Sequence, residues 1–175
     1  VMGGPSYSFT VHGPDEFDDA RSLSVDDKLA HAGFAVAISH FTKSQMLRFG
    51  GSRFADKIHI VHCGIDPEEF SVMPDETMDA HTLVCVGRLS PNKGQALIPE
   101  AVARLRGEFP ALKVILVGDG EARADVEAAI RAHGVGAHVE LAGWRANAEV
   151  RRLIGRSRAL VLPTFAEGLP IVIME

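Results

Sequence analysis

The strongest constraint on the fold is the alternation between short apolar runs and longer amphipathic stretches from end to end of the chain. Two of the runs, residues 83–86 and 114–117, are continuous apolar blocks. Such blocks are typical of parallel strands that helices bury on both faces. The alternating order therefore predicts an α/β fold, with a doubly wound parallel sheet from about residue 80 onward.

Seven runs are predicted strands, and three amphipathic stretches are predicted helices. The strands are residues 7–12, 34–38, 57–62, 82–87, 113–118, 138–142 and 159–163. The helices are residues 94–109, 121–133 and 146–157. We expect each helix to end at a helix breaker, namely Pro110, Gly134 and Gly155.

An acidic stretch that contains proline and lacks apolar periodicity, residues 64–80, predicts a linker. The residues before it supply only three strands, so they resemble the last third of another α/β domain. We place the boundary between residues 72 and 73, which divides the chain into 1–72 and 73–175. The chain starts at Val1 and stops inside an apolar run, so we expect an internal fragment of a longer protein.

Composition excludes several classes of protein. There are 18 Lys plus Arg against 23 Asp plus Glu, for a net charge of -5, and no basic stripe of the kind that binds nucleic acid. No apolar run approaches the roughly 20 residues of a membrane-spanning helix. The two cysteines, Cys63 and Cys85, form no CxxC motif, so we expect both to be reduced, in a cytoplasmic protein. The eight histidines form no metal-binding set.

In open parallel sheets, ligands bind beyond the carboxyl ends of the strands. The loop after residues 82–87 carries Arg88 and Lys93 at the start of a predicted helix. Two cations and free helix N–H groups favour an anion, phosphate above all. The alternative is a solvated loop with two surface charges.

The next strand is followed by Gly118 and Gly120, which make half of a dinucleotide-binding fingerprint. Arg123 stands where the third glycine belongs, so a tight strand-to-helix turn is the favoured interpretation. Further along, the single tryptophan, Trp144, follows Gly143 at another strand end. It could form the wall of a pocket for a flat base or cap the core, and both interpretations stay open.

Two carboxylates, Glu167 and Glu175, flank a predicted helix start at Pro170. A pair of carboxylates could bind the hydroxyls of a sugar or ribose. Alternatively, one is a helix-start charge and the other an exposed helix residue. Near the start of the chain, His12 ends a strand beside Gly13, where an imidazole can carry a proton or polarise a group. A purely structural histidine is the alternative.

Together these motifs resemble those of the retaining glycosyltransferases of family 4 (glycosyl transferases group 1). That family has the GT-B fold, with an acceptor-side and a donor-side Rossmann-like domain. The similar segments are residues 9–13, 37–39, 60–70, 86–94, 116–120 and 165–175. His62 and Cys63 stand where the family usually has Pro-Asn. The resemblance implies that 1–72 is the C-terminal part of the acceptor-side domain with the linker, and that 73–175 is a truncated donor-binding domain.

The resemblance also implies roles for individual residues. Arg88 and Lys93 would hold the donor diphosphate and stabilise the departing nucleotide, with no metal and no cofactor. Glu175 would bind the ribose, and Glu167 the donor sugar. His12 would act near that sugar, so the implied catalytic set is His12, Glu167, Arg88 and Lys93. The predicted donor-binding set comprises Arg88, Lys93 and Glu167 with Gly87, Gly118, Gly168, Leu169 and Glu175. Gly143 and Trp144 join this set because they follow a strand end.

The implied activity is transfer of a hexose, with retention of configuration, from a UDP-, GDP- or ADP-linked sugar to a carbohydrate or lipid-linked acceptor. Surface polysaccharide synthesis is the expected setting, in the cytoplasm or peripherally at the inner face of the cytoplasmic membrane. The alternatives are a non-catalytic nucleotide-sugar binding module and another GT-B enzyme, such as a sugar-nucleotide epimerase. We expect the fragment itself to bind donor weakly and to turn over nothing.

Overall fold

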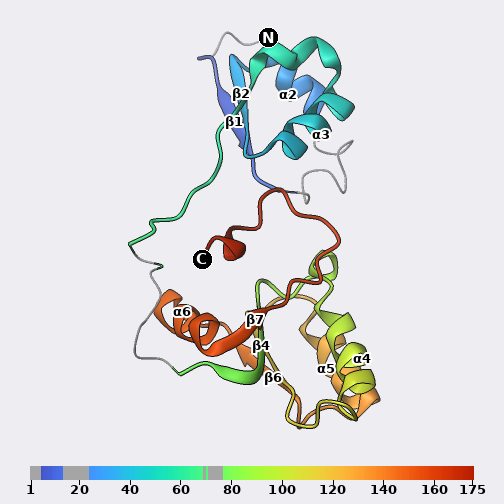
Figure 1. Cartoon of the computed structure of the whole chain (residues 1–175). Helices are drawn as coiled ribbons and strands as arrows, with labels where there is room; N and C mark the ends of the chain where they lie inside the picture. The colour runs from blue at the N-terminus through green and yellow to red at the C-terminus, as the bar shows by residue number, and fades with distance from the viewer. Residues whose placement is uncertain (1–4, 14–23, 69, 71–76) are drawn as a thin grey trace. The chain divides into compact units, whose positions relative to one another are not determined.

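The computed structural model describes residues 5–13, 24–68, 70 and 77–175. The chain forms two compact units (Figure 1). Unit 1 comprises Val1–Gly64 with Glu167–Ile171, and unit 2 comprises Ile65–Ala166 with Val172–Glu175. The predicted domain boundary, between residues 72 and 73, lies outside the described residues.

Unit 1 is built on a parallel three-stranded sheet with the order β1-β2-β3. The strands are β1 (Ser8–Val11), β2 (Phe34–Ala37) and β3 (Ile58–Ile60). Two helices, α2 (Val25–His31) and α3 (His40–Gly50), pack on the sheet through Leu29 and Met46, both fully buried. Apolar residues of the strands thus face a core that the helices close.

Local signals define the ends of α3. The hydroxyl of Ser39 accepts a hydrogen bond of 3.1 Å from the backbone N–H of Thr42, which is an N-cap. At the other end, Gly51 has a φ of 103° and ends the helix. A 3-10 helix, Ser52–Lys57, then leads into β3.

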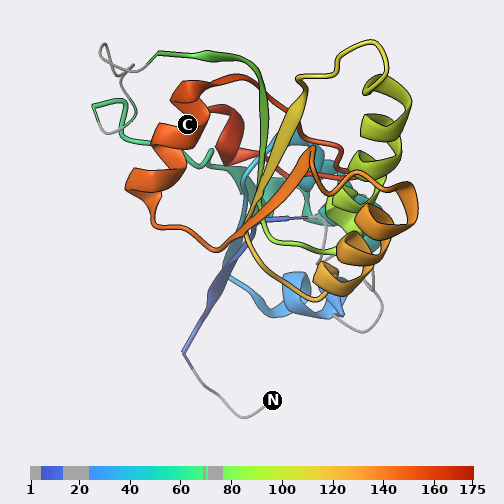
Figure 2. The same ribbon diagram turned by 90° about the horizontal axis from the view of Figure 1, so that it is seen from below.

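Unit 2 is built on a parallel four-stranded sheet with the order β6-β5-β4-β7. The strands are β4 (Asp79–Val86), β5 (Lys113–Val117), β6 (Val139–Gly143) and β7 (Ser157–Leu160). The helices are α4 (Ile98–Leu105), α5 (Arg123–His133) and α6 (Asn147–Arg156). Figures 1 and 2 show α4 and α5 together on one face of this sheet and α6 on the other face.

The α/β class with parallel sheets is confirmed, and each predicted strand has a counterpart in the structure. The apolar blocks that were predicted to be buried supply Val84, Val114 and Leu116, which are 2% exposed or less. A strand that is buried on both faces needs apolar side chains in succession. Such a strand can therefore be recognised in the sequence without knowledge of the strands beside it.

The predicted helix bounds were partly wrong. Residues 94–97 do not join α4, because Gly94 adopts a left-handed φ of 67° and the turn after it, Gln95–Leu97, is a 3-10 helix. Gly155 lies inside α6 rather than ending it. The helix expected after Pro170 is a single 3-10 turn, Ile171–Ile173. Glu175 lies after this turn and is not part of a helix.

Candidate functional site

Two loops of unit 2 pack against each other at the carboxyl ends of β4 and β5. We call residues 87–94 the β4 loop and residues 118–122 the β5 loop. The Gly87 N–H donates to the Val117 carbonyl at 2.9 Å, and the Leu89 N–H to the Asp119 carbonyl at 3.0 Å. The Ala122 N–H returns a bond of 3.0 Å to the Leu89 carbonyl. The two loops therefore form one continuous backbone surface.

A third segment, which follows β7, supports the β4 loop. The Phe165 N–H donates to the Asn92 carbonyl at 2.9 Å, and the Thr164 hydroxyl donates to the same carbonyl at 3.2 Å. A β carbon at Gly94 would overlap the Pro163 carbonyl oxygen. Lys93 is therefore held in a turn that is braced from the next strand of the sheet.

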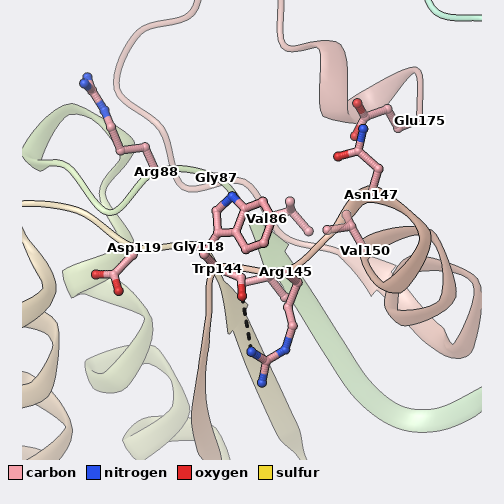
Figure 3. Close-up of a pocket in the computed structure, with 11 residues that line it drawn as sticks. Val86, Gly87, Arg88, Gly118, Asp119, Trp144, Arg145, Asn147, Val150 and Glu175 are labelled. Atoms are coloured by element: carbon pink, nitrogen blue, oxygen red, sulfur yellow. Dashed lines mark hydrogen bonds between the residues drawn. The ribbon is translucent and has the colours of Figure 1, made fainter.

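A cavity of about 390 Å³ opens at the carboxyl ends of β4, β5 and β6, beside α6 (Figure 3). Its volume lies within the range of small-molecule sites, roughly 300–1,000 Å³. Its position is the one at which open α/β sheets bind ligands. The lining residues are Val86, Gly87, Arg88, Val117, Gly118, Asp119, Trp144, Arg145, Asn147, Val150 and Glu175.

The lining combines cations, carboxylates and one aromatic ring. The charged lining residues are Arg88, Arg145, Asp119 and Glu175. Figure 3 shows the Arg145 guanidinium turned toward the Trp144 carbonyl. The Asp119 carboxylate accepts bonds from the Gly120 N–H at 2.8 Å and from Arg123 at 3.2 Å. Arg123 also pairs with Glu127 at 2.9 Å, so these contacts fix the position of the Asp119 carboxylate.

Trp144 does not cap the core, because its side chain is 74% exposed. It lines the cavity instead, so its indole face is available to a flat ligand. The residue after it, Arg145, donates to the Trp144 carbonyl at 3.2 Å and pairs with Glu149 at 3.0 Å. These contacts connect residues 144–146, the loop between β6 and α6, to the first turn of α6.

The structure brings five of the predicted site residues together around the cavity: Gly87, Arg88, Gly118, Trp144 and Glu175. Gly143 supports them, since its carbonyl accepts a bond of 2.9 Å from the Gly118 N–H. Lys93 is not among the lining residues; it ends the 3-10 helix Pro91–Lys93 of the β4 loop.

Six lining residues were not among the predicted site residues: Val86, Val117, Asp119, Arg145, Asn147 and Val150. Val86 and Val117 lie at strand ends, and Asp119 and Arg145 follow strand ends closely, so the carboxyl-end rule could have found them. Asn147 lies instead at the start of a helix. Val150 could not be found that way, because its position depends on how α6 packs beside the sheet.

The other predicted residues, His12, Glu167, Gly168 and Leu169, belong to unit 1. A β carbon at Gly168 would overlap the His12 carbonyl oxygen, so the segment passes directly against the end of β1. The His12 ring is exposed, and its Nδ1 lies 3.9 Å from the Cys63 sulfur. Unit 1 thus gathers the predicted histidine with the first part of the predicted two-carboxylate element.

No cluster of three or more His, Cys, Asp or Glu side chains with metal-binding geometry occurs among the described residues. Within the same residues, every helix is too short or too polar to cross a membrane.

Comparison with known proteins identifies relatives of the chain. Residues 68–175 match the family model of the glycosyl transferases group 1. The amylovoran biosynthesis glycosyltransferase AmsK of Erwinia amylovora is 27% identical over 128 residues, which are 69% of this chain and 31% of the relative. The alpha-D-kanosaminyltransferase of Streptomyces kanamyceticus is 33% identical over 97 residues, 55% of this chain and 25% of the relative.

Solved structures show the same fold. HepE of Anabaena, in complex with UDP and glucose, superposes with a TM-score of 0.75 at 20% identity over 90% of this chain and 46% of its own. TarM of S. aureus superposes with a TM-score of 0.79 at 14% identity over 97% of this chain and 34% of its own. The expected GT-B type of fold is confirmed. The chain spans less than half the length of each of these relatives.

Proposed function

Because the chain belongs to the glycosyl transferases group 1 family, we propose that the cavity of unit 2 binds the nucleoside diphosphate of a nucleotide-sugar donor. One observation carries the proposal. A guanidinium, an exposed indole and a carboxylate, from Arg88, Trp144 and Glu175, line one cavity at the carboxyl ends of parallel strands. These are the groups that suit a phosphate, a base and a ribose.

Each group has a defined task. Arg88 pairs with phosphate oxygens through its planar fork of donors, and Lys93 adds a second positive charge to the same loop. The Trp144 indole stacks on the base. Glu175 accepts hydrogen bonds from the ribose hydroxyls. The backbone of Gly87 and Gly118 lets the phosphates approach closely.

The reaction is the transfer of a hexose to a carbohydrate or lipid-linked acceptor, with retention of configuration. Negative charge builds on the diphosphate as it leaves, and preorganised cations stabilise that charge without a metal. The catalytic roles of His12 and Glu167, and donor contacts of Gly143, Gly168 and Leu169, rest on the family resemblance. Relatives named for phosphatidylinositol and undecaprenol-linked acceptors support a lipid-linked acceptor. We place the protein in the cytoplasm, with peripheral contact at the inner face of the cytoplasmic membrane.

Calorimetry of the chain with UDP, GDP, ADP and NAD tests donor binding. Neighbouring structures contain UDP, and one relative is named for GDP-mannose, so both belong in the panel. We expect one nucleoside diphosphate to bind best, and the Arg88→Ala/Lys93→Ala variant to lose at least about tenfold in affinity. The matched control is Arg104→Ala, an exposed arginine on α4 paired with Glu100. Binding of NAD alone, or equal loss in the control, would overturn the proposal.

A further inference from the structure

Gln95 is a buried polar residue that directly follows the β4 loop in the chain. It lies in the 3-10 helix Gln95–Leu97, and only 3% of its surface is exposed. Its side-chain Nε2 donates a hydrogen bond of 2.8 Å to the backbone carbonyl of Arg88. The same nitrogen lies 3.9 Å from the position of a β carbon at Gly87. Gln95 therefore supports the peptide group that joins Arg88 to Leu89.

The other polar atom of this side chain has no partner. The Gln95 Oε1 is buried, and no donor within the described part of the chain reaches it. A buried acceptor without a donor is unfavourable, because it loses its hydrogen bonds to water and gains none. A methionine would fill nearly the same volume without that cost. A methionine would, however, leave the Arg88 carbonyl without its donor, so the glutamine exchanges one unpaired acceptor for another and fixes the Arg88 carbonyl in doing so.

The bond from Gln95 completes the attachment of the β4 loop. On either side of Arg88, the Gly87 N–H and the Leu89 N–H bond to the carbonyls of Val117 and Asp119. Gln95, which lies later in the chain, donates a hydrogen bond to the carbonyl of Arg88 itself. Three consecutive residues are held in this way, so the Arg88 side chain starts from a fixed backbone where it lines the cavity (Figure 3).

We propose that Gln95 is a positioning residue, which holds the Arg88 backbone so that the guanidinium meets the diphosphate of the donor. This inference rests on the proposed function, because it needs Arg88 to bind phosphate. Gln95 does not line the cavity. Its Oε1 has no partner within the described part of the chain, whereas its Nε2 makes the hydrogen bond that holds Arg88. Misplacement of a charged group by even about 1 Å lowers its interaction energy markedly.

Gln95→Met tests the inference, because it keeps the volume and removes the donor. By calorimetry, affinity for the best nucleoside diphosphate should fall roughly fivefold to tenfold, while affinity for the matching nucleoside stays unchanged. In an Arg88→Ala background, the same substitution should have no further effect, since Gln95 acts through Arg88. The urea midpoint of Gln95→Met should stay close to that of the wild type, since the substitution removes one unpaired acceptor, the Gln95 Oε1, and leaves another, the Arg88 carbonyl.

The matched control is Val102→Ala, which removes buried volume from α4 without touching the β4 loop. It should lower the urea midpoint and leave both affinities unchanged. A lower midpoint with unchanged diphosphate affinity in Gln95→Met would overturn the inference, as would equal losses for nucleoside and diphosphate. An added loss in the Arg88→Ala background would do the same.

A measurement without ligand separates the two proposals. If the wild-type chain binds no nucleoside diphosphate, the proposed function fails, and amide hydrogen exchange then decides the positioning role. Exchange of the Leu89 N–H should be faster in Gln95→Met than in the wild type and unchanged in Val102→Ala. An unchanged Leu89 exchange rate in Gln95→Met would overturn the positioning role.

Discussion

The carbonyl oxygen of Gly87 occupies the space that a β carbon on Gly118 would fill. The same relationship recurs two residues later, where a β carbon on Gly120 would overlap the Leu89 carbonyl oxygen. Both glycines also have positive φ angles, 134° at Gly118 and 155° at Gly120. The glycines after β5 are therefore required by the neighbouring β4 loop as well as by their own turn.

Gly118→Ala should destabilise unit 2 and weaken nucleotide binding. The new methyl group would collide with backbone that hydrogen bonds hold in place, and the φ of 134° is strained for alanine. We expect a loss of about 2–4 kcal/mol in the free energy of unfolding, measured with urea. The control is Gly107→Ala, since nothing lies within 4 Å of its β-carbon position. Equal effects of the two substitutions would contradict the close packing of the loops.

Trp144 should report binding of the nucleotide by fluorescence. It is the single tryptophan of the chain, it is largely exposed, and it lines the cavity. Stacking of a base should quench or blue-shift its emission, because the indole loses contact with water. Trp144→Ala should weaken binding by about 1–3 kcal/mol, the usual effect of removing base–aromatic stacking. Unchanged emission at a nucleotide concentration that calorimetry shows to be saturating would rule out this contact.

Lys57 should stabilise unit 1 through the end of α2. Its Nζ donates to the carbonyls of Leu29, Ala30 and Ala32, at 3.2, 3.3 and 2.9 Å. These carbonyls lie at the helix C-terminus, where a positive charge is favourable. Lys57→Met should lower the free energy of unfolding by about 1–2 kcal/mol. Lys28→Met, an exposed lysine of the same helix, should change it by less than about 0.5 kcal/mol. Similar losses in both variants would refute the capping role.

The two cysteines should differ in reactivity toward thiol reagents. Burial raises the pKa of the Cys85 thiol from 9.0 to about 11, and the charge of Lys93 opposes this only in part. Cys85 should therefore stay unmodified at pH 8 until the chain unfolds, whereas the partly exposed Cys63 should react in the folded chain. A Cys63→Ser variant that still reacts at once when folded would contradict this assignment.

The same pKa predicts a dependence of stability on pH. Between pH 9 and about 11 the unfolded chain loses the Cys85 proton while the folded chain keeps it. The unfolded state then binds fewer protons, so the free energy of unfolding falls as the pH rises through this range. Other groups titrate there as well, and comparison with Cys85→Val isolates the cysteine. A slope that is identical in the variant would show that Cys85 does not contribute.

Much of the fold could be predicted because its signals are local. Runs of apolar residues such as 114–117 mark a buried strand whatever surrounds them. The start of α4 could not be predicted, since the apolar spacing from Leu97 onward suits a helix and gives no sign that the backbone at Gly94 is left-handed. Periodicity records which side chains face a core, and it does not record the φ angle of a single residue.

The sequence by itself determined the order of strands and helices along the chain and the strand ends that Arg88 and Trp144 follow. Those properties depend on side-chain polarity and spacing, which can be seen along one chain. Only the tertiary structure decided that Arg88, Trp144 and Glu175 line one cavity, and that Gln95 donates a hydrogen bond to the Arg88 carbonyl. Such contacts depend on which segments meet in space, and the close approach of two backbones leaves no mark in the sequence except a glycine with several possible explanations.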